Sequence, residues 1–300
     1  MRSPSYAYVE CTTSSANTAF DTSAKHVFDA DHGSVVLTDD ITGDIVWDRS
    51  AGTFTFNDAG IYHIVANLIT ESNSGINTHT VTFNLNSASA IYTGAALCPA
   101  AFDPVGHTHQ RIISISAGDV LHVKAVSSAN TFSLNAGASL VINRITSDVY
   151  ASSTVSTAGS NETTSEFNPL DTDGDGPVFA TAHKVASGIT FTGNAGSMTV
   201  PSAGRYLIMV TNFHAASSTT NSNITLELKE GSNILVTGAT RNHSSTDPEE
   251  TTIFTIEDLA ASAVLTITWD IGSGVCHAAL GTTFTVYKLN DDIKARKSAL

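Results

Sequence analysis

One repeat constrains the fold of this chain more than any other feature of its sequence. The segment AGTFTFNDAGIYHIV at residues 51–65 returns as AGSMTVPSAGRYLIMV at residues 195–210. Gly60 and Gly204 lie 144 positions apart, and so do the tyrosines that follow each of them two residues later. A repeat of this length is the size of a common domain, so the chain is predicted to contain one folding unit twice.

The same offset continues well beyond this segment. Gly94 corresponds to Gly238, and the apolar run at 120–123 corresponds to the run at 264–267. Between these anchors the register slips by a few residues and returns, as insertions in surface loops produce. The predicted domains are therefore residues 1–147 and 148–290, followed by a short basic tail at 291–300.

The apolar residues within each copy have a period of two. In NITLELKE, residues 223–230, Ile224, Leu226 and Leu228 alternate with polar side chains. This alternation is typical of half-buried antiparallel strands. Turn-forming sequences at 57–60 and 116–119 separate such runs, and no window has a helical apolar stripe. Each copy is predicted to be an all-β sandwich of short strands.

Composition excludes several classes of protein. The net charge of −14 and the pI near 5.0 argue against a nucleic-acid partner, since such proteins carry a basic surface. No apolar run approaches a membrane span, and the N-terminus lacks the apolar stretch of a signal peptide. The three cysteines lie far apart, which excludes a Cys-x-x-Cys motif and argues against a disulfide-built module.

The repeated segment resembles a known family. WDRSAGTFTFNDAGIYHI, residues 47–64, is similar to the tumour necrosis factor-like jelly roll, in particular the globular head of complement C-one-q. The resemblance rests on a Gly-x-Phe strand, a short turn and a Gly-x-Tyr that opens the next strand. The matching residues are Gly52, Phe54, Gly60 and Tyr62 in the first copy, and Gly196, Met198, Gly204 and Tyr206 in the second.

A second stretch of the first copy carries the same resemblance. Gly118 and Asp119 resemble the Gly-Asp that opens a later strand of that family, whereas the second copy has Ser262 and Ala263 there. The resemblance implies two tandem antiparallel jelly-roll sandwiches and a homotrimer around a three-fold axis.

No motif for catalysis is present. The chain has no Gly-x-Ser-x-Gly elbow, no P-loop, no Gly-x-Gly-x-x-Gly and no His-Glu-x-x-His. Scattered Ser, His and Asp residues do not by themselves define a site. We therefore expect no enzymatic activity and no cofactor.

The sharpest local signal is LDTDGDGPV at residues 170–178. Asp171, Asp173 and Asp175 occupy the first, third and fifth positions of a calcium-binding loop. The twelfth position is Ala182, where such a loop needs a bidentate Glu. Calcium is one interpretation of this segment. A plain acidic surface turn is the other, and the missing ligand favours it.

Several other residues have a structural interpretation beside a functional one. His107 and His109 would face one side of a strand and, in a trimer, offer six imidazoles to a transition metal, but a solvated loop before the strand at 111–116 is favoured. Arg111 and Arg205 are expected on the surface. Both tryptophans and most phenylalanines are expected in the core.

These observations favour a structural virion protein, most of all a trimeric decoration (cement) protein that stabilises the capsid of a tailed phage. It would be made in the host cytoplasm and lie on the capsid surface, in contact with itself and with the major capsid or another virion protein. Lys294, Arg296 and Lys297 are candidate capsid contacts. The alternatives are a fibre or knob protein, or an extracellular module that recognises glycan or protein through loops at the sandwich ends.

Overall fold

The structure is a computed structural model that describes most of the chain. The described residues are 5–14, 20–29, 37–75, 77–98, 104–155, 162–163, 184–192, 195–216, 222–242, 249–271 and 275–289. The principal division into two compact units falls between Arg144 and Ile145. The regular elements that the structure describes are β-strands, and none of its described residues belongs to a helix long and apolar enough to cross a membrane.

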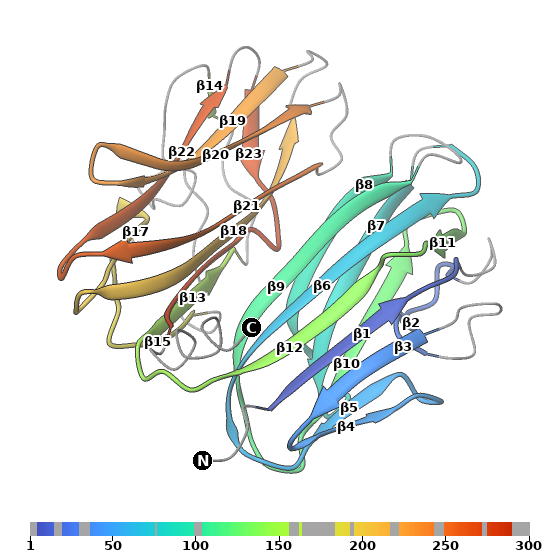
Figure 1. The fold of residues 1–300 in the computed structure, drawn as a ribbon. Coiled ribbons are helices and arrows are strands. Elements are labelled where there is room, and N and C mark those ends of the chain that lie inside the picture. Colours follow the sequence, from blue (N-terminus) through green and yellow to red (C-terminus); the bar gives the residue numbers. More distant parts are fainter. Residues whose placement is uncertain are drawn as a thin grey trace. The chain divides into compact units, whose positions relative to one another are not determined.

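The first domain is a sandwich of two antiparallel sheets (Figure 1). Sheet A has the strand order β3 (Leu37–Thr42), β1 (Tyr6–Cys11), β12 (Ser139–Ile145), β6 (Gly60–Ser72) and β9 (Val105–Ile115), with β11 (Phe132–Leu134) paired to the end of β6. Sheet B has the order β4 (Ile45–Asp48), β5 (Thr53–Phe56), β10 (Val120–Ser127), β7 (Asn77–Leu85) and β8 (Ala90–Cys98), with β2 (Lys25–His26) paired to β10.

Apart from the short strand β2, the second domain repeats this arrangement in its described residues. Sheet C has the order β15 (Lys184–Ser187), β13 (Tyr150–Thr154), β24 (Thr283–Lys288), β18 (Gly204–Ala216) and β21 (Glu249–Leu259), while β23 (Val275–Ala278) pairs with the end of β18 and β14 (Glu162–Thr163) with β23. Sheet D has the order β16 (Thr190–Thr192), β17 (Ser197–Thr199), β22 (Val264–Ile271), β19 (Ser222–Glu230) and β20 (Asn233–Asn242).

In each domain the first strand pairs with the last. Tyr6 of β1 lies opposite Asn143 of β12, and Ala151 of β13 lies opposite Val286 of β24. Strands that are remote in sequence are therefore neighbours in both sheets of a sandwich, as in a jelly roll. This confirms the predicted fold class: all-β, with two tandem antiparallel jelly-roll sandwiches.

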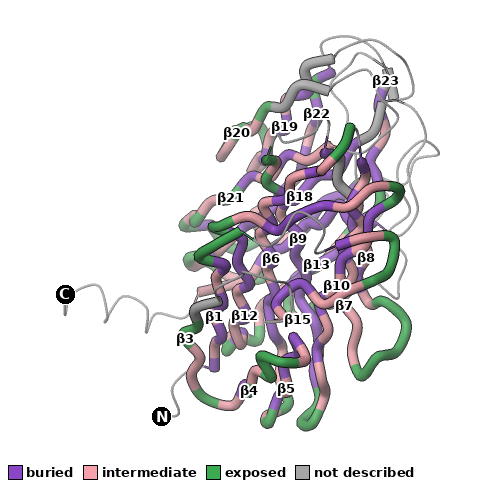
Figure 2. Tube along the Cα trace, turned by 90° about the vertical axis from the view of Figure 1, so that its right-hand side faces the viewer, coloured by how far each residue is buried: buried purple, intermediate pink, exposed green. Residues whose placement is uncertain are grey.

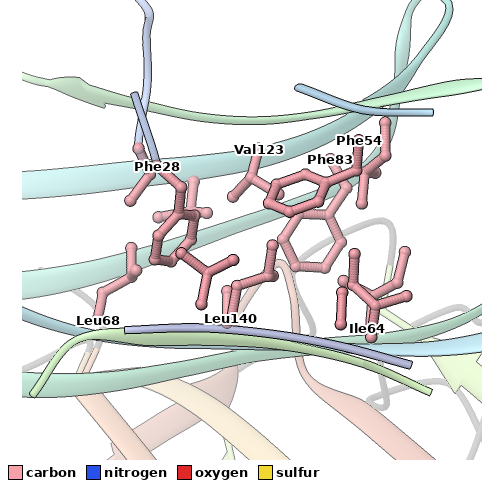
Figure 3. Close-up of a cluster of buried hydrophobic side chains, with 14 of the residues drawn as sticks. Phe28, Phe54, Ile64, Leu68, Phe83, Val123 and Leu140 are labelled. Atoms are coloured by element: carbon pink, nitrogen blue, oxygen red, sulfur yellow. The ribbon is translucent and has the colours of Figure 1, made fainter. Parts of the chain in front are cut away.

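The core of each domain comes from alternate residues of its strands. Figure 2 shows buried residues alternating with more exposed ones along the strands of both domains, as period-two sequences produce. Side chains from sheets A and B meet in the first core, where Phe54, Phe83 and Val123 pack opposite Ile64 and Leu140 (Figure 3). Trp269 fills the second core and is fully buried, as predicted.

The Gly-x-Tyr motif closes a turn in the first domain with three side chains. The Tyr62 hydroxyl donates a hydrogen bond of 3.0 Å to the carbonyl oxygen of Asp58. Arg144 of β12 donates to the Asp58 carboxylate at 3.2 Å and to the Ala59 carbonyl at 2.8 Å. A Cβ atom on Gly60 would lie 2.8 Å from the Arg144 Nε atom. The glycine therefore leaves the space that the guanidinium needs to reach the turn.

The second domain closes the same turn with a different cation. Tyr206 donates to the Ser202 carbonyl at 2.7 Å. Lys288, which lies 144 positions after Arg144, donates to the Ser202 hydroxyl at 3.0 Å and to the Ala203 carbonyl at 2.8 Å. A side chain on Gly204 would collide with the Lys288 stem. Both repeats thus join the last strand to the turn that opens β6 or β18, and we call this arrangement the turn clamp.

We expect the substitution Gly60→Ala to lower the free energy of unfolding of the first domain by about 1–2 kcal/mol, because the methyl group displaces Arg144 from the turn. Urea denaturation followed by tryptophan fluorescence would measure this change. Gly106→Ala is the matched control, since nothing lies within 4 Å of the added carbon atom. Equal losses in the two variants would contradict the role assigned to the clamp.

Candidate functional site

The residues predicted to bind calcium or a capsid lie outside the described residues. Asp171, Asp173 and Asp175 belong to the segment 164–183, and the tail cations belong to the segment 290–300. The calcium interpretation, the acidic-turn interpretation and the capsid contact at Lys294, Arg296 and Lys297 all stay predictions.

The histidines predicted to lie in a solvated loop are instead buried in a strand. His107 and His109 belong to β9, and both are less than 5% exposed. They share their face of the strand with Ile113 and Ile115 of the first core. Both the loop interpretation and a metal site on a trimer axis are therefore wrong, because these imidazoles point into the sandwich.

Of the two arginines expected on the surface, one is buried and one is exposed. Arg111 alternates with the same inward residues of β9 and is only 5% exposed, so the expectation of a surface position was wrong for it. Burial lowers its pKa to about 10, although the nearby Tyr92 raises that pKa. Arg205 does lie on the surface, where it forms a bidentate ion pair with Asp258 at 2.8–3.1 Å.

Polar side chains occupy one end of the first core. His79 of β7 bonds through its Nδ1 atom to the Thr70 hydroxyl at 2.8 Å, and its ring stacks on Phe132 at 3.9 Å. The Tyr92 hydroxyl lies 3.1 Å from the Nδ1 atom of His109. These residues lie on strands of both sheets, so their polar side chains meet in the interior of the sandwich rather than on its surface.

Burial keeps these imidazoles neutral. It lowers the pKa of His79 to about 3 and that of His107 to about 4, and it holds the pKa of His109 well below its ordinary value. Neither ring nitrogen of His107 has a hydrogen-bond partner in the described part of the chain. Within those residues, no group of three or more metal-ligating side chains could hold an ion. The arrangement is sensitive to acid rather than built for a metal.

This burial predicts a loss of stability in acid. The unfolded pKa of histidine is near 6.5, so the folded state binds fewer protons and is fully stable only above that pH. Stability is lost as the pH falls from 6.5 toward the folded pKa, by about 2 kcal/mol for each such histidine between pH 7 and pH 5.

We expect His107→Leu to reduce the difference in unfolding free energy between pH 7 and pH 5 by about 2 kcal/mol, because it removes one group that must charge on unfolding. Urea denaturation of the variant and the parent chain at both pH values would measure this. The substitution also removes the repulsion by which His107 lowers the pKa values of His79 and His109, but groups remote from it titrate alike in both proteins. An unchanged difference would contradict the assignment.

An exposed apolar strip lies on the outward face of sheet C. Ile253 and Leu259 of β21 are buried in the second core, whereas Phe254 and Ile256, on the opposite side of the strand, are 52% and 46% exposed. The exposed ion pair between Arg205 and Asp258 flanks this strip. We call Phe254 and Ile256 the β21 strip.

Sequence reasoning missed the β21 strip, although its signal is present. The segment IFTIEDL at 253–259 places apolar residues at both odd and even positions, so one face of the strand cannot hold them all. A strand that is apolar on both sides is either covered on both faces or exposes one of them. An exposed pair of this kind marks a candidate interaction surface.

Comparison with known proteins supplies no family for the chain. No family model matches it, and no curated protein matches it. Solved structures similar to part of it include the Eiger TNF from S. frugiperda, with 16% identity, a TM-score of 0.35, and coverage of 48% of this chain and 93% of that one. Murine APRIL at pH 8.0 is 13% identical, with a TM-score of 0.33 over 48% of this chain and 100% of its own. Structural similarity at this level does not support a fold assignment, so the assignment rests on the strand order.

Proposed function

We propose that the chain is a structural virion protein, a trimeric decoration (cement) protein on the capsid of a tailed phage. The observation that carries the proposal is the β21 strip on a duplicated jelly-roll scaffold. Two large apolar side chains on one strand of an outward sheet face favour association with another protein surface. Repeated sandwiches without a catalytic motif suit a role in assembly.

Self-association is the first step of this function. Burying apolar surface contributes about 25 cal/mol for each Å² removed from water, and a stable interface buries about 800 Å² on each partner. The β21 strip supplies the apolar centre of such an interface, and the ion pair beside it supplies a polar rim. Closed point-group symmetry gives the assembly a finite number of subunits. The resemblance to the tumour necrosis factor-like family favours three subunits around a three-fold axis.

Binding to the shell is the second step. A trimer that binds only assembled capsid stabilises it by mass action. The protein carries a net charge of −14, and three of its fourteen Lys and Arg residues lie in the final ten positions: Lys294, Arg296 and Lys297. An acidic capsid surface would attract this tail, and salt would weaken the attraction because charges are screened over roughly 8–10 Å.

We expect Phe254→Glu to dissociate the trimer, because a carboxylate placed at the interface loses its hydration without gaining a partner. Light scattering on the parent chain should give about three times 31.3 kDa, and the variant should give the monomer mass. Val46→Glu is the matched control, since Val46 is equally exposed, at 53%, but lies on β4 of the first domain. A parent chain that stays monomeric, both free and on particles, would overturn the trimer.

We expect deletion of residues 291–300 to leave folding and trimer mass unchanged and to weaken particle binding. Replacement of Lys294, Arg296 and Lys297 by Gln should reproduce the loss of particle binding if charge is responsible. Raised salt should weaken particle binding by the parent chain more than particle binding by this variant. Co-sedimentation with purified capsids would measure both effects. A truncated chain that decorates particles as well as the parent would move the contact to a domain face. A parent chain that never sediments with particles would instead favour the binding-module alternative.

A further inference from the structure

Two histidines meet on the outward face of sheet B in the first domain. His26 of β2 lies directly opposite Lys124 of β10, which places it diagonally beside His122 on the same face. The Nε2 atom of His26 lies 2.9 Å from the Nδ1 atom of His122, and the ring centroids are 5.1 Å apart. Both side chains are partly exposed. This pair is separate from the buried imidazoles of the same domain and from the β21 strip.

A strained turn supports the pair from one side. Asn86 and Ser87, between β7 and β8, have φ angles of 52° and 59°, a left-handed conformation that residues other than glycine adopt at a cost. Asn86 is held there by bonds to the Asp119 carboxylate at 2.7 Å and from the Val120 amide at 2.8 Å. The turn brings the Ser87 hydroxyl to 3.2 Å from the remaining ring nitrogen of His122.

This second contact is compatible with the tautomer of His122 that a metal ligand needs, since a hydroxyl can accept a proton from a ring nitrogen. If its Nε2 atom donates a proton to Ser87, its Nδ1 atom carries a lone pair that points toward His26. Metal-binding histidines have the same support, since a bond from the distal ring nitrogen fixes the tautomer and the orientation of the ring. The neighbouring imidazole then donates its own Nε2 proton to that lone pair.

The spacing of the two rings matches that of two imidazoles on one metal ion. With metal–nitrogen bonds of about 2.0–2.1 Å in a tetrahedral site, the two nitrogens lie about 3.3 Å apart and the ring centroids about 5.2 Å apart. The observed separations are 2.9 Å and 5.1 Å. The rings need only turn so that both lone pairs point at one position, and rotation about the last side-chain bond of histidine is soft.

We propose that His26 and His122 form a binding site for a borderline divalent transition-metal cation such as Zn²⁺, Ni²⁺ or Cu²⁺. The Nε2 atom of His26 and the Nδ1 atom of His122 are the ligands, and water fills the other positions. The cation takes the place of the proton between the rings, and the His26 proton moves to its own Nδ1 atom. No electron is transferred, and neutral rings release no net proton.

The charges around the pair limit the affinity and set its pH dependence. Lys124 faces the pair from β10, and Lys25 lies on β2 in an ion pair with Asp21 at 3.0 Å. Asp29, which follows β2, and Asp119 at the strained turn are the nearby carboxylates. Burial and then Lys124 lower the pKa of His122. Binding weakens in acid, because protons compete with the metal ion for the imidazole nitrogens.

Zinc titration calorimetry on the tag-free full-length chain tests the site. We expect a component at one ion per chain whose affinity falls at least tenfold in His26→Gln and in His122→Gln, as loss of one of two ligands requires. Ser87→Ala should lower the affinity less than either, and Mg²⁺ should not compete. His277→Gln is the control, because it removes a partly buried imidazole from the second domain and should change nothing.

Circular dichroism without metal shows whether each variant is folded. If a variant is unfolded, the Cu²⁺ electron paramagnetic resonance spectrum of the parent chain tests the site instead. The proposed site requires that this spectrum show couplings to two nitrogen nuclei. Parent-like zinc affinity in both folded ligand variants would overturn the proposal. So would a loss of the one-to-one component in His277→Gln, or a copper spectrum with fewer than two nitrogens.

Discussion

The turn clamp is the interaction on which each sandwich depends. It joins the end of the last strand to the turn that opens a central strand, through one cation and one tyrosine hydroxyl in each domain. A jelly roll pairs strands that are far apart in sequence, so the chain must close long loops before those strand pairs stabilise the fold. A contact that fixes the last strand against an early turn holds the two ends of this topology in register.

The clamp also explains which residues the repeat preserves. Glycine is needed where the cation approaches the backbone, and tyrosine is needed where a ring enters the core while its hydroxyl reaches a carbonyl oxygen. The cation itself changes from Arg144 to Lys288, because either side chain can donate to a turn carbonyl. Geometry is thus conserved between the copies more strictly than chemistry.

The sequence predicted the fold better than it predicted the sites. Period-two alternation and the glycine–tyrosine spacing led to two jelly rolls, because both reflect local rules of strands and turns. The same reasoning failed at His107, His109 and Arg111, which are buried in β9. A polar residue inside a sandwich is usually paired with a group on another strand, as His109 is with Tyr92. That partner is 17 residues away, on the opposite sheet, and no spacing rule identifies it.

Duplication lets the two copies keep one scaffold and differ on their surfaces. The strand order and the clamp are common to both, whereas the histidine pair lies on sheet B of the first domain and the β21 strip on sheet C of the second. At the positions 144 residues after His26 and His122 stand Leu170 and Thr266, so the second copy cannot form the same pair. Residues that face the core are constrained by packing, while outward residues are free to acquire separate roles. The function of this chain is therefore to be sought on these outward faces and not in the interior that the repeat conserves.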